Sequence, residues 1–146
     1  MRTRFSLRLF TAAAATTVAA AVAWAAAPEV PQTTDQPTVL VTVLFMCEGA
    51  RSVDPWEVHV KSGQDLDWVL DPKSDATDFR IRRKQSVRSW PFEGSAPYGG
   101  RKGTPAKARG RKNAFKGRYS YDIEASCPAS NGKVEWKRID PDIIVD

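Results

Sequence analysis

The chain has 146 residues, with 22 Lys plus Arg against 17 Asp plus Glu, two Cys and one His, and 42% of it is hydrophobic. This hydrophobic fraction argues against a disordered tail protein and for a chain that closes one core within a single domain. One His and no recognisable nucleophile or metal-ligand cluster exclude most familiar hydrolytic and metal-dependent chemistries.

The N-terminal segment has the pattern of a secretory signal peptide. Three Arg within the first eight residues precede an uncharged, Ala-rich run over residues 9–27, and Ala23 and Ala25 supply the small side chains that signal peptidase requires. We therefore predict a signal peptide over residues 1–25, cleaved after Ala25, and a periplasmic or secreted bacterial protein without a membrane span after cleavage. The alternative is an uncleaved anchor, but the run falls below the roughly 20 strongly apolar residues that a bilayer core demands.

The expected folded domain begins after a short leader. Residues 26–37 are rich in Pro, Thr and Gln without apolar periodicity, which is typical of a flexible segment. We place the domain at residues 38–146. It opens with a nearly continuous β-branched and apolar run over residues 38–47, which predicts a strand buried on one face and largely covered on the other.

Shorter segments with strand-like alternation follow. Residues 55–60 and 65–70 flank a short turn, and we predict two strands joined there, with Trp56 on the inward side of the first. Alternation predicts further strands over residues 78–82, 117–124, 133–138 and 142–145. About seven short strands, with no convincing helical period, predict an all-β protein with a β-sandwich fold.

The two cysteines, Cys47 and Cys127, suggest a disulfide if the chain is exported. Oxidising compartments pair thiols, and only one pairing is available here. We predict a bridge between neighbouring strands, worth roughly 4–5 kcal/mol in the chain-entropy picture. Two buried free thiols are the alternative.

Several motifs of the predicted domain occur together in a known family. The most characteristic is Val58-x-Val60-x-x-Gly63-x-x-Leu66-x-Trp68, and it is followed by Phe79-x-Ile81, Tyr119-x-Tyr121 and Ile143-x-Val145. This series resembles the cupredoxin family, as found in periplasmic plastocyanin-like domains, over residues 39–146. The resemblance implies a cupredoxin-like Greek-key β-sandwich, here with one long basic loop.

Cupredoxins move single electrons at one copper ion, which two His, a Cys thiolate and usually a weak axial Met hold. By the resemblance, the first His would lie within residues 74–78, the Cys at or near Ile123, and the other ligands shortly after it. This chain has no His or Met there, and a shifted Cys127 thiolate without an imidazole does not make the site. We expect no copper site, no metal and no cofactor.

The remaining candidates for catalysis are expected on the surface. His59 alternates with two inward-facing Val residues, so it should point to solvent. Two acidic pairs flank turns and favour solubility and edge protection: Asp65 with Asp67, and Asp140 with Asp142. We therefore expect no enzymatic activity.

Positive charge gathers in a long irregular stretch over residues 86–116 and just beyond it. Between residues 99 and 118 there are eight basic residues and no acidic one: Arg101, Lys102, Lys107, Arg109, Arg111, Lys112, Lys116 and Arg118. A second basic patch lies on or after one predicted strand and is expected nearby: Arg80, Arg82, Arg83, Lys84 and Arg88. A solvated, mobile loop balanced by the acidic remainder is the interpretation we favour for this charge, although crowded cations repel one another unless an anion is near.

The functional hypothesis is a non-catalytic, monomeric binding or accessory module. It would hold an anionic protein, surface or glycan through the basic loop, with Arg80 and Arg82 beside it. Nucleic acid suits the charge but not the compartment, and the loop lacks the interleaved aromatic residues of a stacking platform. Two alternatives stay open: a divergent copper-binding or electron-transfer protein, and an enzyme inhibitor that presents a rigid loop.

Overall fold

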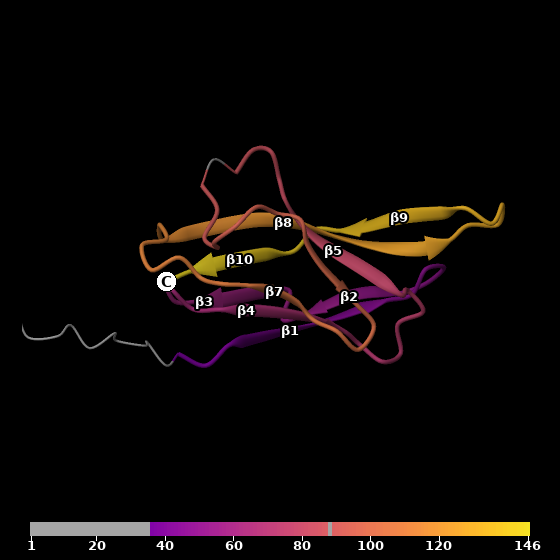
Figure 1. Ribbon diagram of the computed structural model, residues 1–146, viewed down its shortest axis with the longest axis horizontal. Helices are drawn as coiled ribbons and strands as arrows, with labels where there is room; N and C mark the ends of the chain where they lie inside the picture. Colours follow the sequence, from indigo (N-terminus) through magenta and orange to yellow (C-terminus); the bar gives the residue numbers. More distant parts are fainter. Residues whose placement is uncertain (1–35, 88) are drawn as a thin grey trace, which may run out of the picture. The chain divides into compact units, whose positions relative to one another are not determined.

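The computed structural model describes residues 36–87 and 89–146 (Figure 1). The predicted signal peptide, its cleavage after Ala25, nearly all of the leader and Arg88 lie outside these described residues. In the part of the chain that the structure describes, there is no helix long and apolar enough to cross a membrane.

The described residues form ten strands in two sheets. The first sheet has the order β2 (Arg51–Asp54), β1 (Val39–Phe45), β4 (Leu66–Leu70), β7 (Ala106–Ala108). The second has the order β3 (Glu57–Val60), β10 (Asp142–Val145), β8 (Gly117–Pro128), β5 (Asp78–Arg83), β6 (Tyr98–Arg101). Strand β9 (Val134–Ile139) pairs with the second half of β8.

The predicted all-β sandwich is confirmed, and the strand pairing needs correction. There are ten strands in place of about seven, and two pairs, β1 with β4 and β10 with β3, are parallel. The strands predicted over residues 55–60 and 65–70 do not pair, because β3 joins the second sheet and β4 the first. Alternation shows which side chains face the core, but not from which sheet they reach it.

Trp56 was expected inward and is 50% exposed. The reason is that β3 begins only at Glu57, so the alternation that buries Val58 and Val60 does not extend back to the tryptophan. The same side chain therefore stands on the surface, beside the start of the strand.

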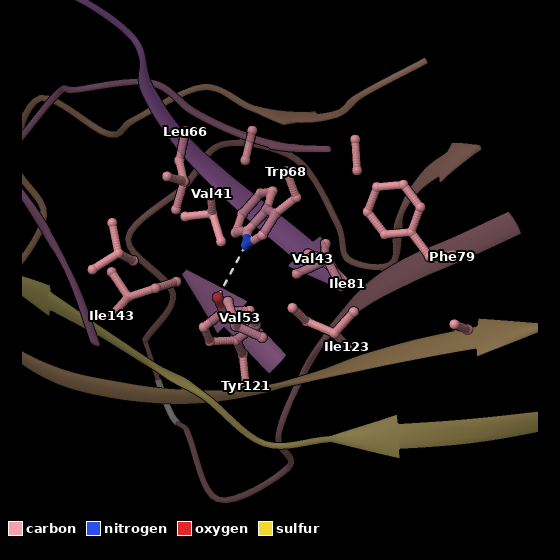
Figure 2. Close-up of a cluster of buried hydrophobic side chains, with 14 of the residues drawn as sticks. Val41, Val43, Val53, Leu66, Trp68, Phe79, Ile81, Tyr121, Ile123 and Ile143 are labelled. Atoms are coloured by element: carbon pink, nitrogen blue, oxygen red, sulfur yellow. Dashed lines mark hydrogen bonds between the residues drawn. The ribbon is translucent and has the colours of Figure 1, made fainter. Parts of the chain in front are cut away.

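The core lies between the sheets and centres on Trp68 of β4 (Figure 2). This side chain is fully buried, and its ring packs against Phe92, Tyr98 and Tyr121 at centroid distances of 5.8–6.4 Å. Its Nε1 donates a hydrogen bond to the Tyr121 hydroxyl at 3.0 Å, so the buried indole N–H has a partner. Burying a large side chain of this kind stabilises the fold by about 2–3 kcal/mol.

The predicted disulfide between Cys47 and Cys127 is confirmed. Cys47 follows β1 in the first sheet, whereas Cys127 lies in β8 of the second. The expectation of neighbouring strands was wrong, because the bridge crosses from one sheet to the other. It ties the sandwich together at the end where β1 stops.

The stretch over residues 86–116 is more regular than predicted. It contains β6 and β7, and an isolated bridge pairs Phe92 with Gly110. A side chain at Gly110 would stand 2.3 Å from the Gln64 carbonyl oxygen, and the Gly110 N–H donates to Asp65 Oδ1 at 2.9 Å. The close approach that only glycine permits thus fastens this segment to the turn between β3 and β4.

Candidate functional site

The segment where a cupredoxin would supply its first copper-binding His has a structural role in this chain. The Ser74 hydroxyl accepts a hydrogen bond from Phe45 N at 3.0 Å and donates one to Val43 O at 3.2 Å. Asp75 Oδ1 accepts from Cys47 N at 2.7 Å. These contacts hold the backbone at the end of β1 and leave no imidazole there.

The residues at the expected ligand positions do not fit a type 1 copper site. Cys127 is bonded to Cys47 and supplies no thiolate, and the Ile123 side chain is fully buried in the core. Among residues 36–87 and 89–146, no group of three or more His, Cys, Asp and Glu side chains is placed to hold a metal ion.

His59 is exposed on β3, as its alternation predicted. Its Nδ1 lies 3.0 Å from Asp146 Oδ2, and its Nε2 lies 3.6 Å from Glu57 Oε1. The sequence could not place Asp146, because this residue reaches His59 only through the parallel pairing of β10 with β3. The arrangement is an exposed cluster of polar side chains, and exposed contacts of this kind contribute little to stability.

The acidic pairs do more than face water. Asp142 Oδ1 accepts a hydrogen bond from Ser120 Oγ at 2.6 Å, and Asp142 Oδ2 accepts one from Arg118 at 2.7 Å. These bonds lower the pKa of the Asp142 carboxyl below its ordinary value, and the bond from Ser120 has the largest effect. Asp65 Oδ1 accepts a hydrogen bond from the Gly110 N–H, so Asp142 holds neighbouring side chains and Asp65 holds backbone.

The structure separates the ten cations predicted to bind an anion into two groups. Four have acidic partners: Arg118 with Glu57 and Asp142, Lys107 with Asp67, and both Arg80 and Arg82 with Glu124. The other six form no ion pair with any described residue: Arg101, Lys102, Arg109, Arg111, Lys112 and Lys116. Of these, Lys102 donates to the Ser74 carbonyl at 2.7 Å.

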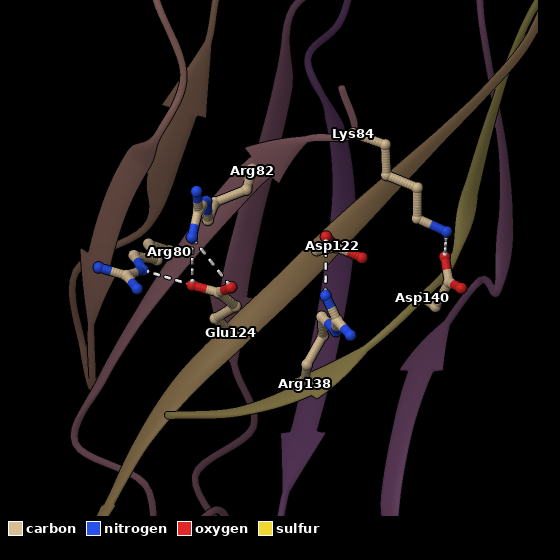
Figure 3. A network of polar contacts seen from close by, with 7 residues as sticks. All are labelled: Arg80, Arg82, Lys84, Asp122, Glu124, Arg138 and Asp140. Carbon is tan, nitrogen blue, oxygen red and sulfur yellow. Dashed lines mark hydrogen bonds and ion pairs between the residues drawn. The ribbon is translucent and has the colours of Figure 1, made fainter. Parts of the chain in front are cut away.

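Arg80 and Arg82 belong to a network of charged side chains on the outward face of β5, β8 and β9 (Figure 3). Glu124 is nearly buried, and its carboxylate lies 2.6 Å from Arg80 Nε and 3.3 Å from an Arg82 nitrogen. Arg138 lies 3.6 Å from Asp122, and Lys84 is paired with Asp140. Cross-strand registers bring these charges together, and most of the charge on this face is compensated internally.

Positive charge is not compensated in the same way in the lining of a pocket of about 390 Å³. Three arginines line it, Arg82, Arg83 and Arg111, and its remaining lining consists of Trp90 and the segment 94–97, with no acidic residue. The predicted basic loop, through Arg111, and the second basic patch, through Arg82 and Arg83, meet here. We call this the arginine pocket.

Local hydrogen bonds fix two walls of the arginine pocket. Arg111 Nε donates to the Phe92 carbonyl at 2.8 Å, and Trp90 Nε1 donates to the Tyr98 hydroxyl at 3.1 Å. The Tyr98 hydroxyl in turn donates to the Glu93 carbonyl at 2.8 Å, and burial raises its pKa above the ordinary value. These hydrogen bonds tie Trp90, which lines the pocket, to Tyr98 and to the backbone at Glu93.

A second depression, of about 570 Å³, adjoins the arginine pocket through Pro97, which lines both. Its lining is mostly apolar and includes Trp136 of β9, which is 42% exposed, and Gly99 of β6. Arg80 Cζ lies 4.1 Å from the centroid of the Trp136 ring, within the range of a cation–π contact. We call this depression the tryptophan groove.

Sequence reasoning missed Trp90, Trp136 and the segment 94–97 as parts of a surface site. Trp136 fell in a correctly predicted strand, but alternation alone did not show that this edge strand lies outside the core. The only sequence signal was the unusual charge of the neighbouring residues.

No protein-family model and no curated protein matches the chain. Among solved structures, an oxidised amicyanin mutant matches with 19% identity over 75% of this chain and 82% of its own, at a TM-score of 0.43. A purple cupredoxin from Nitrosopumilus maritimus matches with 14% identity over 74% of this chain and 99% of its own, at 0.43. A reduced Cu(I) form of another amicyanin mutant matches with 14% identity over 78% and 87%, at 0.42.

These matching chains are cupredoxins. These matches agree with the resemblance noted in the sequence, and at these identities and TM-scores they carry no argument about fold or activity. The Cu(I) ion belongs to the amicyanin mutant. The cupredoxin-like sandwich of this chain has Ser74, Ile123 and a disulfide where copper ligands would be expected.

Proposed function

We propose that the protein is an exported, non-catalytic, cupredoxin-like binding module that holds an anionic ligand in the arginine pocket. The observation that carries this proposal is the convergence of Arg82, Arg83 and Arg111 on one pocket that no carboxylate lines. The basic loop then acts through one well-placed member, Arg111, and the other cations of the loop raise the local potential around it.

Electrostatics support this reading of the pocket. Guanidinium groups that share a pocket repel one another, so the fold must hold them there. Arg83 has no acidic partner among the described residues, and Arg82 reaches Glu124 only through contacts of 3.3 and 3.5 Å. Their N–H groups can therefore donate to a planar or tetrahedral oxyanion, which arginine binds in a bidentate manner.

The sequence and the disulfide support export. Residues 1–25 have the pattern of a signal peptide, and a disulfide such as Cys47–Cys127 persists in oxidising compartments. We propose a monomeric protein of the periplasm or the extracellular space, with no catalytic role and no cofactor.

A charge-matched pair of variants tests the proposal. The double variant Arg83→Ser/Arg111→Ser removes two pocket cations, and Lys73→Ser/Lys133→Ser removes two exposed lysines that do not line the pocket. We expect inorganic pyrophosphate, titrated calorimetrically at low salt, to bind the arginine variant at least about tenfold more weakly than the wild type, because hydrogen bonds to charged groups are lost. The lysine variant should bind within about twofold. Equal weakening in both variants would show that the protein attracts anions only through its net charge.

A further inference from the structure

The tryptophan groove has a floor that is open to a ligand. Gly99 lies opposite Arg80 in the β5–β6 pairing, on the outward face, and a Cβ built there meets no atom within 4 Å. The next residue, Gly100, faces the core, where a Cβ would stand 2.4 Å from the Phe79 ring. The outward face at Gly99 is thus exposed backbone beside an exposed indole.

The groove and the arginine pocket form one track on this side of the protein. Pro97 lines both depressions, and Arg80 and Arg82 alternate along the outward face of β5, one at the groove and one at the pocket. A ligand that spans the two would therefore meet a mostly apolar surface, with Asp78, Arg80 and Arg101 in its lining, at one end and three arginines at the other.

The groove also contains a carboxylate, and this restricts the ligand. Asp78 lines it together with Thr104 and Arg101, and its Oδ2 accepts a hydrogen bond from Thr77 at 2.8 Å. A polyanion with a charge on every unit would bring negative charge to Asp78. A ligand with hydroxyl groups would instead donate to this carboxylate and place its anionic group among the arginines.

We infer that the anionic ligand is an acidic oligosaccharide, with one sugar ring against the part of Trp136 that Arg80 leaves exposed, next to Gly99, and a carboxylate-bearing ring in the arginine pocket. A pyranose ring presents C–H groups to an aromatic face and hydroxyl groups at its rim, which matches an indole flanked by Asp78 and Thr104. This inference rests on the proposed function and adds the chemical class of the ligand.

The probe is a linear trisaccharide with one terminal uronic acid, compared with the neutral trisaccharide of the same linkage and with a triglutamate peptide. Binding is measured by calorimetry and by tryptophan fluorescence. We expect the uronic trisaccharide to bind at least about tenfold more tightly than either comparison ligand. Triglutamate that binds as tightly as the trisaccharide would overturn the inference and leave the proposed function standing.

Variants of the groove locate the sugar. Trp136→Ala should weaken binding of the uronic trisaccharide about tenfold and reduce the fluorescence change, because the stacking of a ring on an aromatic side chain has an energy of this order. Trp56→Ala is the matched control, since Trp56 is also about half exposed but does not line the groove, and this variant should bind like the wild type. Equal binding by Trp136→Ala and the wild type would contradict the placement.

Gly99→Phe provides a second, independent variant. The phenyl ring would extend from Gly99 into the open space of the groove, and Gly99 does not line the arginine pocket. We expect it to bind pyrophosphate like the wild type and to lose the trisaccharide. If neither pyrophosphate nor the trisaccharide binds the wild type, the proposed function fails and the inference fails with it. If Gly99→Phe keeps full affinity for the trisaccharide, only the inference fails.

Discussion

The indole Nε1 of Trp68 donates a hydrogen bond to the Tyr121 hydroxyl at 3.0 Å, and this bond joins β4 of one sheet to β8 of the other. Both side chains are fully buried (Figure 2). Burial raises the pKa of the Tyr121 phenol, so the hydroxyl is neutral over the physiological pH range. It accepts the hydrogen bond from the indole N–H in this neutral form.

Removal of this hydroxyl should be costly. Tyr121→Phe leaves the Trp68 N–H unsatisfied in the core, and we expect the free energy of unfolding to fall by about 1–3 kcal/mol. Urea denaturation followed by tryptophan fluorescence measures the change. Tyr119→Phe is the control, because Tyr119 donates to the carbonyl of exposed Phe115, which water can solvate after the change. A loss in Tyr119→Phe equal to that in Tyr121→Phe would contradict the special role of the indole bond.

The inter-sheet disulfide should dominate resistance to unfolding. Cys47 and Cys127 are 80 residues apart in the chain, and in the chain-entropy picture closing such a loop stabilises the folded state by about 4–5 kcal/mol. We expect Cys47→Ser/Cys127→Ser, or the wild type in reductant, to lose stability of this order in urea denaturation. Unchanged stability in both samples would show that the sandwich holds without the bridge.

Acid should weaken the contact between β8 and β10. The pKa of Asp142 is lowered in the folded state, so its contribution to stability is present above the unfolded pKa, near about 4, and is lost as the pH falls through the folded pKa. We expect the free energy of unfolding of Asp142→Asn to fall less between about pH 5 and pH 2 than that of the wild type.

Ser120→Ala tests the cause of this shift. The Ser120 hydroxyl is the first contributor to the lowered pKa of Asp142, so its removal should bring that pKa closer to its ordinary value. The acid-dependent part of the stability should then shrink, and NMR titration of the Asp142 carboxyl measures the pKa directly. An unchanged pKa would assign the shift to Arg118.

Two adjacent glycines of β6 should respond in opposite ways to the same change. A Cβ at Gly100 would stand 2.7 Å from Ala106 N, as well as against the Phe79 ring, so we expect Gly100→Ala to destabilise the protein by about 1–3 kcal/mol. Gly99→Ala meets open space and should be neutral or slightly stabilising. Thermal unfolding of the two variants checks the contrast, which would vanish if β6 could shift away from β7.

Local patterns in the sequence predicted the strands with strong alternation and the cysteine pairing. The segments that became β1, β5, β8, β9 and β10 were all placed near their observed positions. The missed strands were β2, β6 and β7. Strands β6 and β7 are short, and β6 contains Gly99 and Gly100, so their pairing depends on neighbours far away in the chain.

The candidate site was predictable only in its charge. Counting cations identified Arg111 and Arg82, but gave equal weight to Arg118 and Lys107, which pair with carboxylates of other strands and do not line the arginine pocket. That difference depends on sheet register, because Arg118 lies opposite Ile144, next to Asp142 on the same strand. The sequence alone does not show which strands pair, so it does not show which cations have acidic partners.

The position of β10 has a consequence for the timing of folding. Among the described residues, strand β3 pairs only with β10, and the contact between His59 and Asp146 joins residues 87 positions apart in the chain. During synthesis, residues 57–60 therefore remain unpaired until residues 142–145 have emerged. A chain threaded across a membrane from its N-terminus would complete this sheet only after nearly all of it had passed through.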